Sequence, residues 1–241
     1  MFDWIFFDLD GTLWDHGSAS AHALKQLCAE EGLDFNALAP LFKEANERLW
    51  GELSAGAITV QELRTRRFRM ILDKVFHGAR GGQVTDEEAD RLSDRYLHHY
   101  LPFPGELEGA SDALAIAAAA ARVGVLTNAP HETQDPKLAS IEARHHVEIM
   151  MASDDAGVLK PDPGFFERAE ALAGHPPKER LLYVGDSWAF DMVGAHAVGW
   201  HCLWIGGGNE PPETLPRVHA VESIAEAAIW IADRTQESAT A

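Results

Sequence analysis

Short apolar runs alternate with helical patterns along much of this chain, and several of the runs stop abruptly at polar residues. The runs that we interpret as β-strands are residues 4–7, 122–127, 146–151, 181–185 and 200–205. Helical patterns separate the later runs, and this alternation predicts right-handed crossovers and a parallel sheet with helices on both faces. We therefore predict an α/β fold in which ligands bind beyond the carboxyl ends of the strands.

One long stretch, from about residue 16 to residue 99, interrupts the alternation because it carries only helical signals. Within it, four apolar residues between positions 68 and 75 recur at i, i+3, i+4 and i+7 and form one apolar face. The prolines of residues 102–105 mark the return to the sheet, since proline does not continue a helix. The predicted division is a core of residues 1–15 and 100–234, an inserted helical domain of residues 16–99, and a disordered tail of residues 235–241.

The charge composition limits the classes of partner. Lys and Arg number 20 and Asp and Glu number 38, and the net charge of −18 argues against binding to nucleic acid or to an anionic membrane surface. An anionic substrate would need local positive charge, which a divalent cation held by clustered carboxylates can supply. The two cysteines, Cys28 and Cys202, lack the spacing of a metal site, and no apolar segment is long enough to span a bilayer. We expect a cytoplasmic protein.

Two carboxylates separated by one residue follow the first apolar run, in the sequence Asp8-Leu9-Asp10-Gly11-Thr12. Glycine permits the backbone angles of a tight turn at this point. One carboxylate of such a pair can act as a nucleophile while the other transfers a proton. The same residue types also form ordinary turns, so the motif alone fits a catalytic site and a structural turn equally well.

Polar residues also follow the later runs. Thr127 and Asn128 can hydrogen-bond phosphate oxygens without adding negative charge, although such residues are also common in turns. Lys160 precedes a helix that we predict from residue 164 to residue 172. Because the chain is short of cations, we interpret this lysine as facing an anion. Asp186 ends a long apolar run, and Asp191 follows it at the start of another predicted helix.

These residues, taken in order, resemble the four motifs of the haloacid dehalogenase-like superfamily. The matching segments are Asp8-x-Asp10-Gly11-Thr12, Thr127, Lys160-Pro161, and Gly185-Asp186-Ser187 with Asp191. The resemblance covers the whole chain and implies a Rossmann-like three-layer domain with an inserted α-helical cap of that superfamily's first type. Residues 3–8, 49–50, 56–59, 67–68 and 157–161 further resemble the bacterial pyrimidine 5′-nucleotidases of the superfamily, whereas Ala129-Pro130 replaces their expected glycine.

The resemblance implies a magnesium-dependent phosphatase that works through an aspartyl-phosphate. Asp8 would be the nucleophile, and Asp10 would be the acid and base. The implied Mg²⁺ ligands are Asp8, Asp186 and the backbone carbonyl of Asp10; the implied phosphate ligands are Thr127 and Asn128, aided by Lys160. Asp191 would be an outer ligand of the metal or would orient Lys160.

Three interpretations of function remain open from the sequence. The leading one is hydrolysis of a small phosphorylated metabolite, above all a nucleoside monophosphate, by a monomer or homodimer. The second is a phosphatase for another metabolite, such as phosphoglycolate or a sugar phosphate. The third is a receiver-like signalling module that binds phosphate, which also combines an acid pair, a hydroxyl and a lysine on a parallel sheet. The dehalogenases that the chain resembles lack an acid at the position of Asp10.

A basic stretch between residues 64 and 74 could contact a nucleotide. We interpret it instead as a solvated helix face that is paired with acidic residues such as Glu62 and Asp73.

Overall fold

The computed structural model describes residues 1–76 and 84–240, without the side chains of residues 76 and 236–240. The chain forms two compact units. The first consists of Met1–His16 and Gly105–Ala241, and the second is Gly17–Pro104.

A six-stranded parallel sheet forms the centre of the first unit, with the strand order β3-β2-β1-β4-β5-β6. The strands are β1 (Trp4–Phe7), β2 (Arg122–Leu126), β3 (Val147–Met151), β4 (Leu181–Gly185), β5 (His201–Ile205) and β6 (Val218–Val221). This order confirms the predicted α/β fold class, and five of the strands were predicted to within one residue. Strand order reverses between β1 and β4, and ligands of such sheets bind beyond the strand ends at that point.

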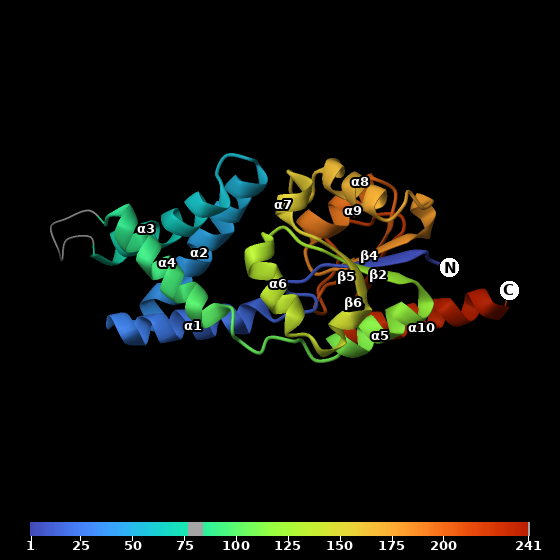
Figure 1. The fold of residues 1–241 in the computed structure, drawn as a ribbon, viewed down its shortest axis with the longest axis horizontal. Helices are drawn as coiled ribbons and strands as arrows, with labels where there is room; N and C mark the ends of the chain where they lie inside the picture. Colours follow the sequence, from blue (N-terminus) through green and yellow to red (C-terminus); the bar gives the residue numbers. More distant parts are fainter. Residues whose placement is uncertain (77–83, 241) are drawn as a thin grey trace. The chain divides into compact units, whose positions relative to one another are not determined.

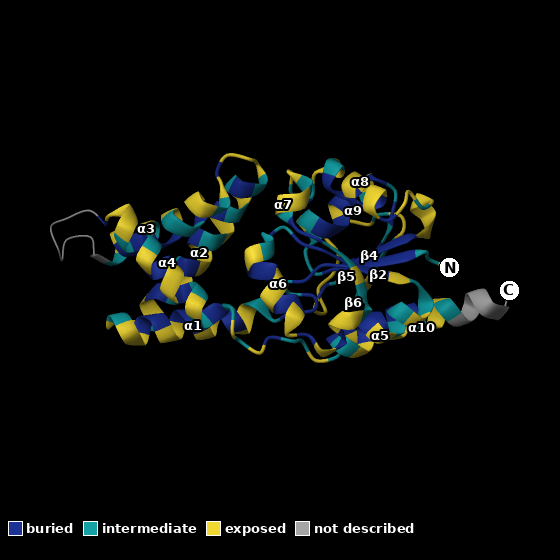
Figure 2. Cartoon of the chain, viewed as in Figure 1, coloured by how far each residue is buried: buried dark blue, intermediate teal, exposed yellow. Residues whose placement is uncertain are grey.

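Large apolar side chains on one face of the sheet explain why the first strand forms where it does. All four residues of β1 are buried, and its side chains alternate between the two faces. Trp4 and Phe6 point to one face, where their ring centroids lie 5.3 Å apart, and the ring of Trp200 lies 5.2 Å from that of Phe6. Phe165 and Phe166 of α8 (Pro163–Leu172) belong to the same apolar cluster. Figure 2 shows β4 (Leu181–Gly185), the neighbour of β1, in the colour of buried residues.

Helices cover both faces of the sheet (Figure 1). Helices α5 (Ala110–Ala120) and α10 (Ile224–Thr240) pack together on one side, and α8 (Pro163–Leu172) and α9 (Val193–Ala197) pack together on the other. Two short helices, α6 (His131–Ala139) and α7 (Ser153–Ala156), follow β2 and β3. Single helical turns are formed by the 3₁₀ segments Glu142–His146 and Lys178–Arg180 and by the π-helical segment Trp188–Met192.

The C-terminal segment differs from the prediction. We expected a disordered tail from residue 235, but α10 continues to Thr240, and residue 241 lies outside the described residues. No glycine or proline interrupts the sequence after Ile224, and its residues are compatible with a helix, so nothing local ends α10 earlier.

The second unit is helical, with α1 (His16–Glu31), α2 (Phe35–Ser54), α3 (Val60–Phe76) and α4 (Asp86–Tyr100). Side-chain oxygens of Asp34 and Thr85 cap α2 and α4 by accepting hydrogen bonds from backbone N–H groups at 2.9 and 3.2 Å. The apolar face predicted between residues 68 and 75 is buried at Phe68, Ile71 and Leu72.

The basic stretch of α3 is divided between surface and interior. Arg66 pairs with Glu62 at 3.2 Å, as expected for a solvated face. Arg67 differs, because it is only 7% exposed. Its guanidinium carbon lies 4.8 Å from the ring centroid of Phe42 and 5.1 Å from that of Tyr96. The interpretation as a uniformly solvated face is therefore wrong at Arg67.

The chain leaves the first unit and returns to it at adjacent points. The backbone N–H of Asp15 donates to the carbonyl of Gly105 at 2.6 Å, and the N–H of Leu107 donates to the carbonyl of Leu13 at 3.0 Å. These bonds tie together the two ends of the inserted segment within the first unit.

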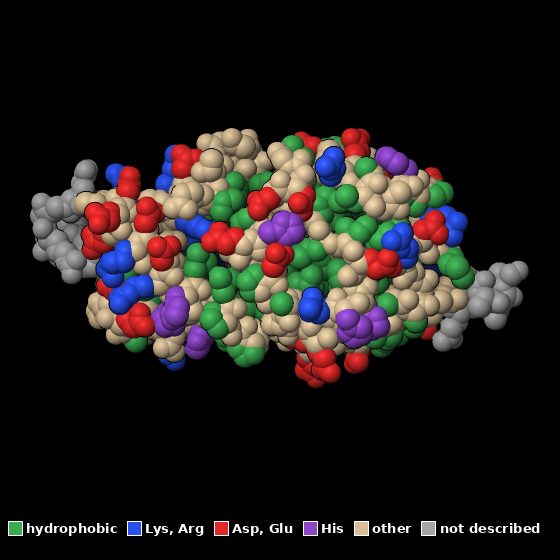
Figure 3. All heavy atoms as spheres, viewed as in Figure 1, with side chains coloured by type: hydrophobic (Ala, Val, Ile, Leu, Met, Phe, Trp, Pro, Cys, Tyr) green, Lys and Arg blue, Asp and Glu red, His purple; other side chains and the backbone are tan. Residues whose placement is uncertain are grey.

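Charged side chains of both signs are interspersed on the face drawn in Figure 3. None of the helices in residues 1–76 and 84–240 is long and apolar enough to cross a membrane.

Candidate active site

The carboxyl ends of the central strands bring the predicted site residues to one edge of the sheet. Asp8 directly follows β1, and its backbone N–H donates to the carbonyl of Val184 in β4 at 2.9 Å. The N–H of Thr127, directly after β2, donates in the same way to the carbonyl of Met151 at 3.0 Å. Asp8 and Thr127 are both buried, so the edge of the sheet holds a polar site with little access to bulk water.

Lys160 lies at the centre of this site and is 2% exposed. Its Nζ atom lies 2.6 Å from Oδ1 of Asp8, 2.7 Å from Oδ1 of Asp191 and 2.8 Å from the hydroxyl of Tyr183. Asp191 and Asp8 hold the pKa of Lys160 above its ordinary value, although burial alone would lower it. Lys160 is thus a fixed positive charge beside Asp8.

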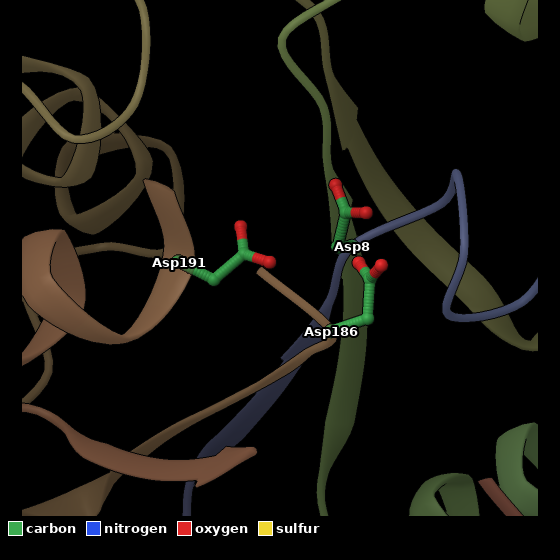
Figure 4. Close-up of side chains that lie close together, drawn as sticks. All are labelled: Asp8, Asp186 and Asp191. Atoms are coloured by element: carbon green, nitrogen blue, oxygen red, sulfur yellow. The ribbon is translucent and has the colours of Figure 1, made fainter. Parts of the chain in front are cut away.

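Three carboxylates gather around the same point (Figure 4). Asp8, Asp186 and Asp191 each offer an oxygen that lies within 4.8 Å of the others. Burial raises the pKa of Asp8 well above its usual range; Lys160 opposes this shift, and Asp191 and Asp186 add to it. Burial, followed by the charge of Asp191, raises the pKa of Asp186 to about 7. The lysine alone does not compensate the charge of these carboxylates.

The carboxylates of Asp8 and Asp186 fit a divalent cation, which binds hard oxygen ligands. Both oxygens of Asp191 already accept hydrogen bonds, Oδ1 from Lys160 and Oδ2 from the backbone N–H of Ser187 at 3.0 Å. Asp186 is more exposed than the other two acids, and its only described side-chain donor is Thr12, at 3.4 Å. The contacts of Asp191 therefore match an orienting role for Lys160 more closely than direct coordination of the metal. Coordination by the carbonyl of Asp10 stays a prediction.

Asp10 is held by two side chains that the sequence interpretation did not include. Nζ of Lys137 lies 2.7 and 2.8 Å from the two carboxylate oxygens of Asp10, and Nε2 of Gln134 donates to Oδ2 at 2.9 Å. Both side chains come from α6 and are buried. Burial tends to raise the pKa of Asp10, but the charges of Lys137 and His16, together with the hydrogen bonds from Lys137 and Gln134, outweigh it and the pKa is lowered. The two residues were missed because lysine and glutamine in a short helix have the local sequence signature of exposed side chains.

Asn128 contacts the lysine segment. Its Oδ1 accepts from the backbone N–H of Lys160 at 2.7 Å, and its Nδ2 donates to the carbonyl of Lys160 at 2.9 Å. One amide N–H of Asn128 is left for a ligand, so phosphate binding by this residue stays a prediction. Thr127 accepts a long hydrogen bond of 3.4 Å from the N–H of Ala129, and its predicted contact with phosphate likewise stays a prediction.

The turn after β4 and the helix after Lys160 follow from local sequence. Asp162 caps α8 by accepting a hydrogen bond from the N–H of Gly164 at 2.8 Å, and Pro163 is the first helical residue, one position before the predicted start. Ser187 caps the π-helical turn that carries Asp191, by accepting from the N–H of Phe190 at 3.3 Å. Tyr183 was missed because it lies inside β4 and has the sequence signature of a core aromatic residue.

A sequence model of the haloacid dehalogenase-like hydrolase family matches residues 2–199. The chain is 27% identical to the pyrimidine 5′-nucleotidase YjjG of Escherichia coli over 93% of this chain and 95% of that protein. It is 28% identical to an (S)-2-haloacid dehalogenase of Pseudomonas putida over 94% of this chain and 95% of that protein.

The fold is similar to that of the putative HAD-hydrolase YfnB of Bacillus subtilis, solved bound to magnesium. The TM-score is 0.82 at 22% identity, with 95% of this chain and 98% of that chain covered. Since the family match spans most of the sequence, the chain belongs to the haloacid dehalogenase-like hydrolases.

Proposed function

We propose that this protein is a magnesium-dependent phosphomonoester hydrolase that works through an aspartyl-phosphate and acts on nucleoside monophosphates. The observation that carries the proposal is the surroundings of Asp8. Its carboxylate lies 2.6 Å from Nζ of Lys160 and within 4.8 Å of carboxylate oxygens of Asp186 and Asp191. A carboxylate that attacks an anionic phosphate needs nearby positive charge. Lys160 supplies one such charge, and the carboxylates could supply another by holding a divalent cation.

In the proposed reaction, Oδ of Asp8 attacks phosphorus and the bond from phosphorus to the leaving oxygen breaks. Asp10, which must carry a proton at this step although Lys137 and His16 lower its pKa, gives that proton to the leaving oxygen, which departs as an alcohol. Asp10 then takes a proton from water as that water attacks the aspartyl-phosphate, and inorganic phosphate is released. Lys160, which Asp191 and Asn128 hold in place, neutralises charge beside Asp8. A magnesium ion held by Asp8 and Asp186 would supply further charge stabilisation at the phosphate.

The substrate class rests on relatives and on Asp10. The likeness to YjjG, a pyrimidine 5′-nucleotidase, favours nucleoside monophosphates over phosphoglycolate and sugar phosphates. A relative named as a (S)-2-haloacid dehalogenase makes removal of halide the second candidate. Asp10 favours the phosphatase, because departure of an alcohol requires a proton donor and departure of halide does not.

The test is a release screen with purified protein. Wild type and Asp8→Asn are incubated, with Mg²⁺ or with EDTA, with pyrimidine and purine nucleoside monophosphates, phosphoglycolate, sugar phosphates and 2-haloacids, and phosphate and halide are measured. Asp8→Asn keeps the size of the side chain and removes its nucleophilic oxygen. We expect phosphate release that depends on Mg²⁺, is highest with pyrimidine nucleotides and is absent in Asp8→Asn.

Other outcomes would contradict the proposal in different ways. Release of halide alone would identify a dehalogenase, and preference for phosphoglycolate or a sugar phosphate would identify the other class of phosphatase. Stoichiometric phosphorylation of Asp8 without turnover would favour the receiver-like module.

A further inference from the structure

Helix α6 directs two buried polar side chains at the second acid of the first motif. Gln134 and Lys137 are three residues apart and therefore share one helix face. They are 0% and 2% exposed, respectively. Between them they contact both oxygens of the Asp10 carboxylate, at 2.7 to 2.9 Å. The carboxylate is thus held at three points by one rigid element.

The burial of Lys137 is costly unless its charge is compensated, since an ammonium group loses its hydration. Asp10 supplies that compensation, and Nζ of Lys137 also lies 4.8 Å from the ring centroid of Trp14. A buried ion pair is seldom more stable than an apolar replacement of the same shape. Stabilisation of the fold alone therefore does not explain why a lysine is buried at position 137.

Gln134 leads to the same conclusion. Among the described residues, its Oε1 atom is buried without a hydrogen-bond partner. The reverse orientation of the amide would turn this oxygen toward the Asp10 carboxylate and repel it. Gln134 therefore keeps its N–H group on Asp10 although its own carbonyl oxygen is left without a partner, which is unfavourable in a buried position.

The start of α6 is itself anchored. The imidazole of His131 lies 2.8 Å from Oδ1 of Asp135 and 2.7 Å from Oδ2 of Asp155, which belongs to α7. The hydroxyl of Thr133 donates to the carbonyl of Pro130 at 3.1 Å. Side chains carried by such an anchored helix hold a group more firmly than side chains on a free loop.

We propose that Lys137 and Gln134 are positioning residues that fix the orientation of the Asp10 carboxylate for proton transfer. The inference rests on the proposed function, in which Asp10 protonates the leaving oxygen and then activates water. Proton transfer is sensitive to small displacements of the acid, so loosening the carboxylate slows the reaction without removing the acid. Dependence on the leaving group distinguishes this role from a structural one, because 4-nitrophenolate departs without a proton and an alkoxide does not.

The experiment compares single-turnover rates of phosphoryl transfer from 4-nitrophenyl phosphate and from uridine 5′-monophosphate. The variants are Lys137→Met, Gln134→Met and the conservative Lys137→Arg. Lys178→Met is the matched control, because Lys178 is a half-exposed lysine of the same unit, 3.5 Å from Glu170. We expect Lys137→Met to lose at least tenfold more rate with the nucleotide than with the nitrophenyl ester. Gln134→Met should show a smaller selective loss, Lys137→Arg should recover part of it, and Lys178→Met should match wild type.

A double-substitution cycle with Asp10→Asn completes the test. If Lys137 acts through Asp10, Asp10→Asn/Lys137→Met is no slower than Asp10→Asn alone. Equal losses with both substrates, additive losses in the cycle, or wild-type rates in Lys137→Met and Gln134→Met would each overturn the inference and leave the proposed function intact. If Lys137→Met fails to fold in thermal unfolding, Gln134→Met and Lys137→Arg decide the matter. Absence of phosphate release by wild type would overturn both proposals.

Discussion

Gly11 and Asp186 approach so closely that a Cβ atom at position 11 would overlap with the carboxylate of Asp186. The two residues belong to the first and the fourth motif, and they meet because β1 and β4 are neighbours in the sheet. Gly11 also has a φ of +88°, a conformation that is unfavourable for residues with side chains. The glycine between the acid pair and Thr12 is therefore required twice, by its own backbone and by the position of a candidate metal ligand.

Substitution of Gly11 tests this packing. Gly174 is a matched control, because it has a φ of +85° and a Cβ atom there would have no neighbouring atom within 4 Å. We expect Gly174→Ala to lose about 1 kcal/mol of unfolding free energy from backbone strain alone. Gly11→Ala should lose more and should lower kcat at least tenfold by displacing Asp186. Urea unfolding and steady-state kinetics check both, and equal stability losses in the two variants would contradict the packing argument.

Removal of the buried lysine should destabilise the protein in a manner that depends on pH. In Lys160→Met the carboxylates of Asp8 and Asp191 lose their positive partner, at a cost of about 3 kcal/mol or more near neutral pH. The pKa of Asp8, which Lys160 lowers in the wild type, should rise further, so the folded state binds more protons than the unfolded state and the free energy of unfolding falls as pH rises. Urea unfolding at pH 5 and pH 8 measures this difference. The expectation would be contradicted if the loss of unfolding free energy in Lys160→Met did not grow between pH 5 and pH 8. It would also be contradicted if Lys178→Met lost as much.

Binding of Mg²⁺ should become stronger as pH rises through 7. The pKa of Asp186, raised to about 7 in the absence of metal, leaves a proton on this carboxyl at lower pH that the ion must displace. The pKa of Asp186 is higher in the folded protein than its ordinary value of 3.8. The free energy of unfolding of the metal-free protein should therefore fall as pH rises from 3.8 toward 7. We expect Mg²⁺ to raise Tm more at pH 8 than at pH 5.5 and to have little effect on Asp186→Asn. An equal rise in Tm at both pH values would exclude Asp186 as a titrating ligand.

His131 should titrate above its ordinary range. Hydrogen bonding to Asp135 raises its pKa above 6.5, and Asp155 adds to this shift against the opposing effect of burial. The pairing of His131 contributes fully to the free energy of unfolding at pH values below the pKa of His131 in the unfolded state. This contribution is lost as pH rises through the pKa of His131 in the folded state. An NMR titration of the imidazole should give a midpoint above 6.5 that falls in Asp155→Asn. Asp154→Asn is the control, since Oδ2 of Asp154 accepts a hydrogen bond from the backbone N–H of His131, at 3.3 Å, and does not contact the imidazole. A midpoint below 6.5 would disprove the pairing.

The strands and their acidic ends could be predicted because they depend on local sequence. A run such as Trp4–Phe7 that is buried on both faces must be apolar throughout, and the polar residue that follows it marks the end of the strand. Strand β6 (Val218–Val221) was not predicted because it is short, none of its residues is fully buried, and its sequence therefore lacks an apolar run.

The contacts that orient the site could not be predicted from local sequence. Lys137 has the sequence signature of a surface lysine, and its partner Asp10 lies 127 positions away along the chain. Asn128 was interpreted as a ligand of phosphate, and only the fold reveals that its amide binds the backbone of Lys160 on both sides. Such contacts depend on which helix packs beside which strand end, and local sequence patterns do not reveal this packing.

The hydrogen bonds from Asp15 to Gly105 and from Leu107 to Leu13 have a consequence for how such a protein can diversify. These hydrogen bonds hold the two ends of the insertion together within the first unit. The backbone that carries Asp8 and Asp10 is therefore fixed locally, whatever the length and structure of the insertion. Any segment whose termini meet can occupy this position, as in tolerated domain insertions. Recombination at this junction could therefore replace the second unit as a whole and keep the residues around Asp8 and Asp10 in place.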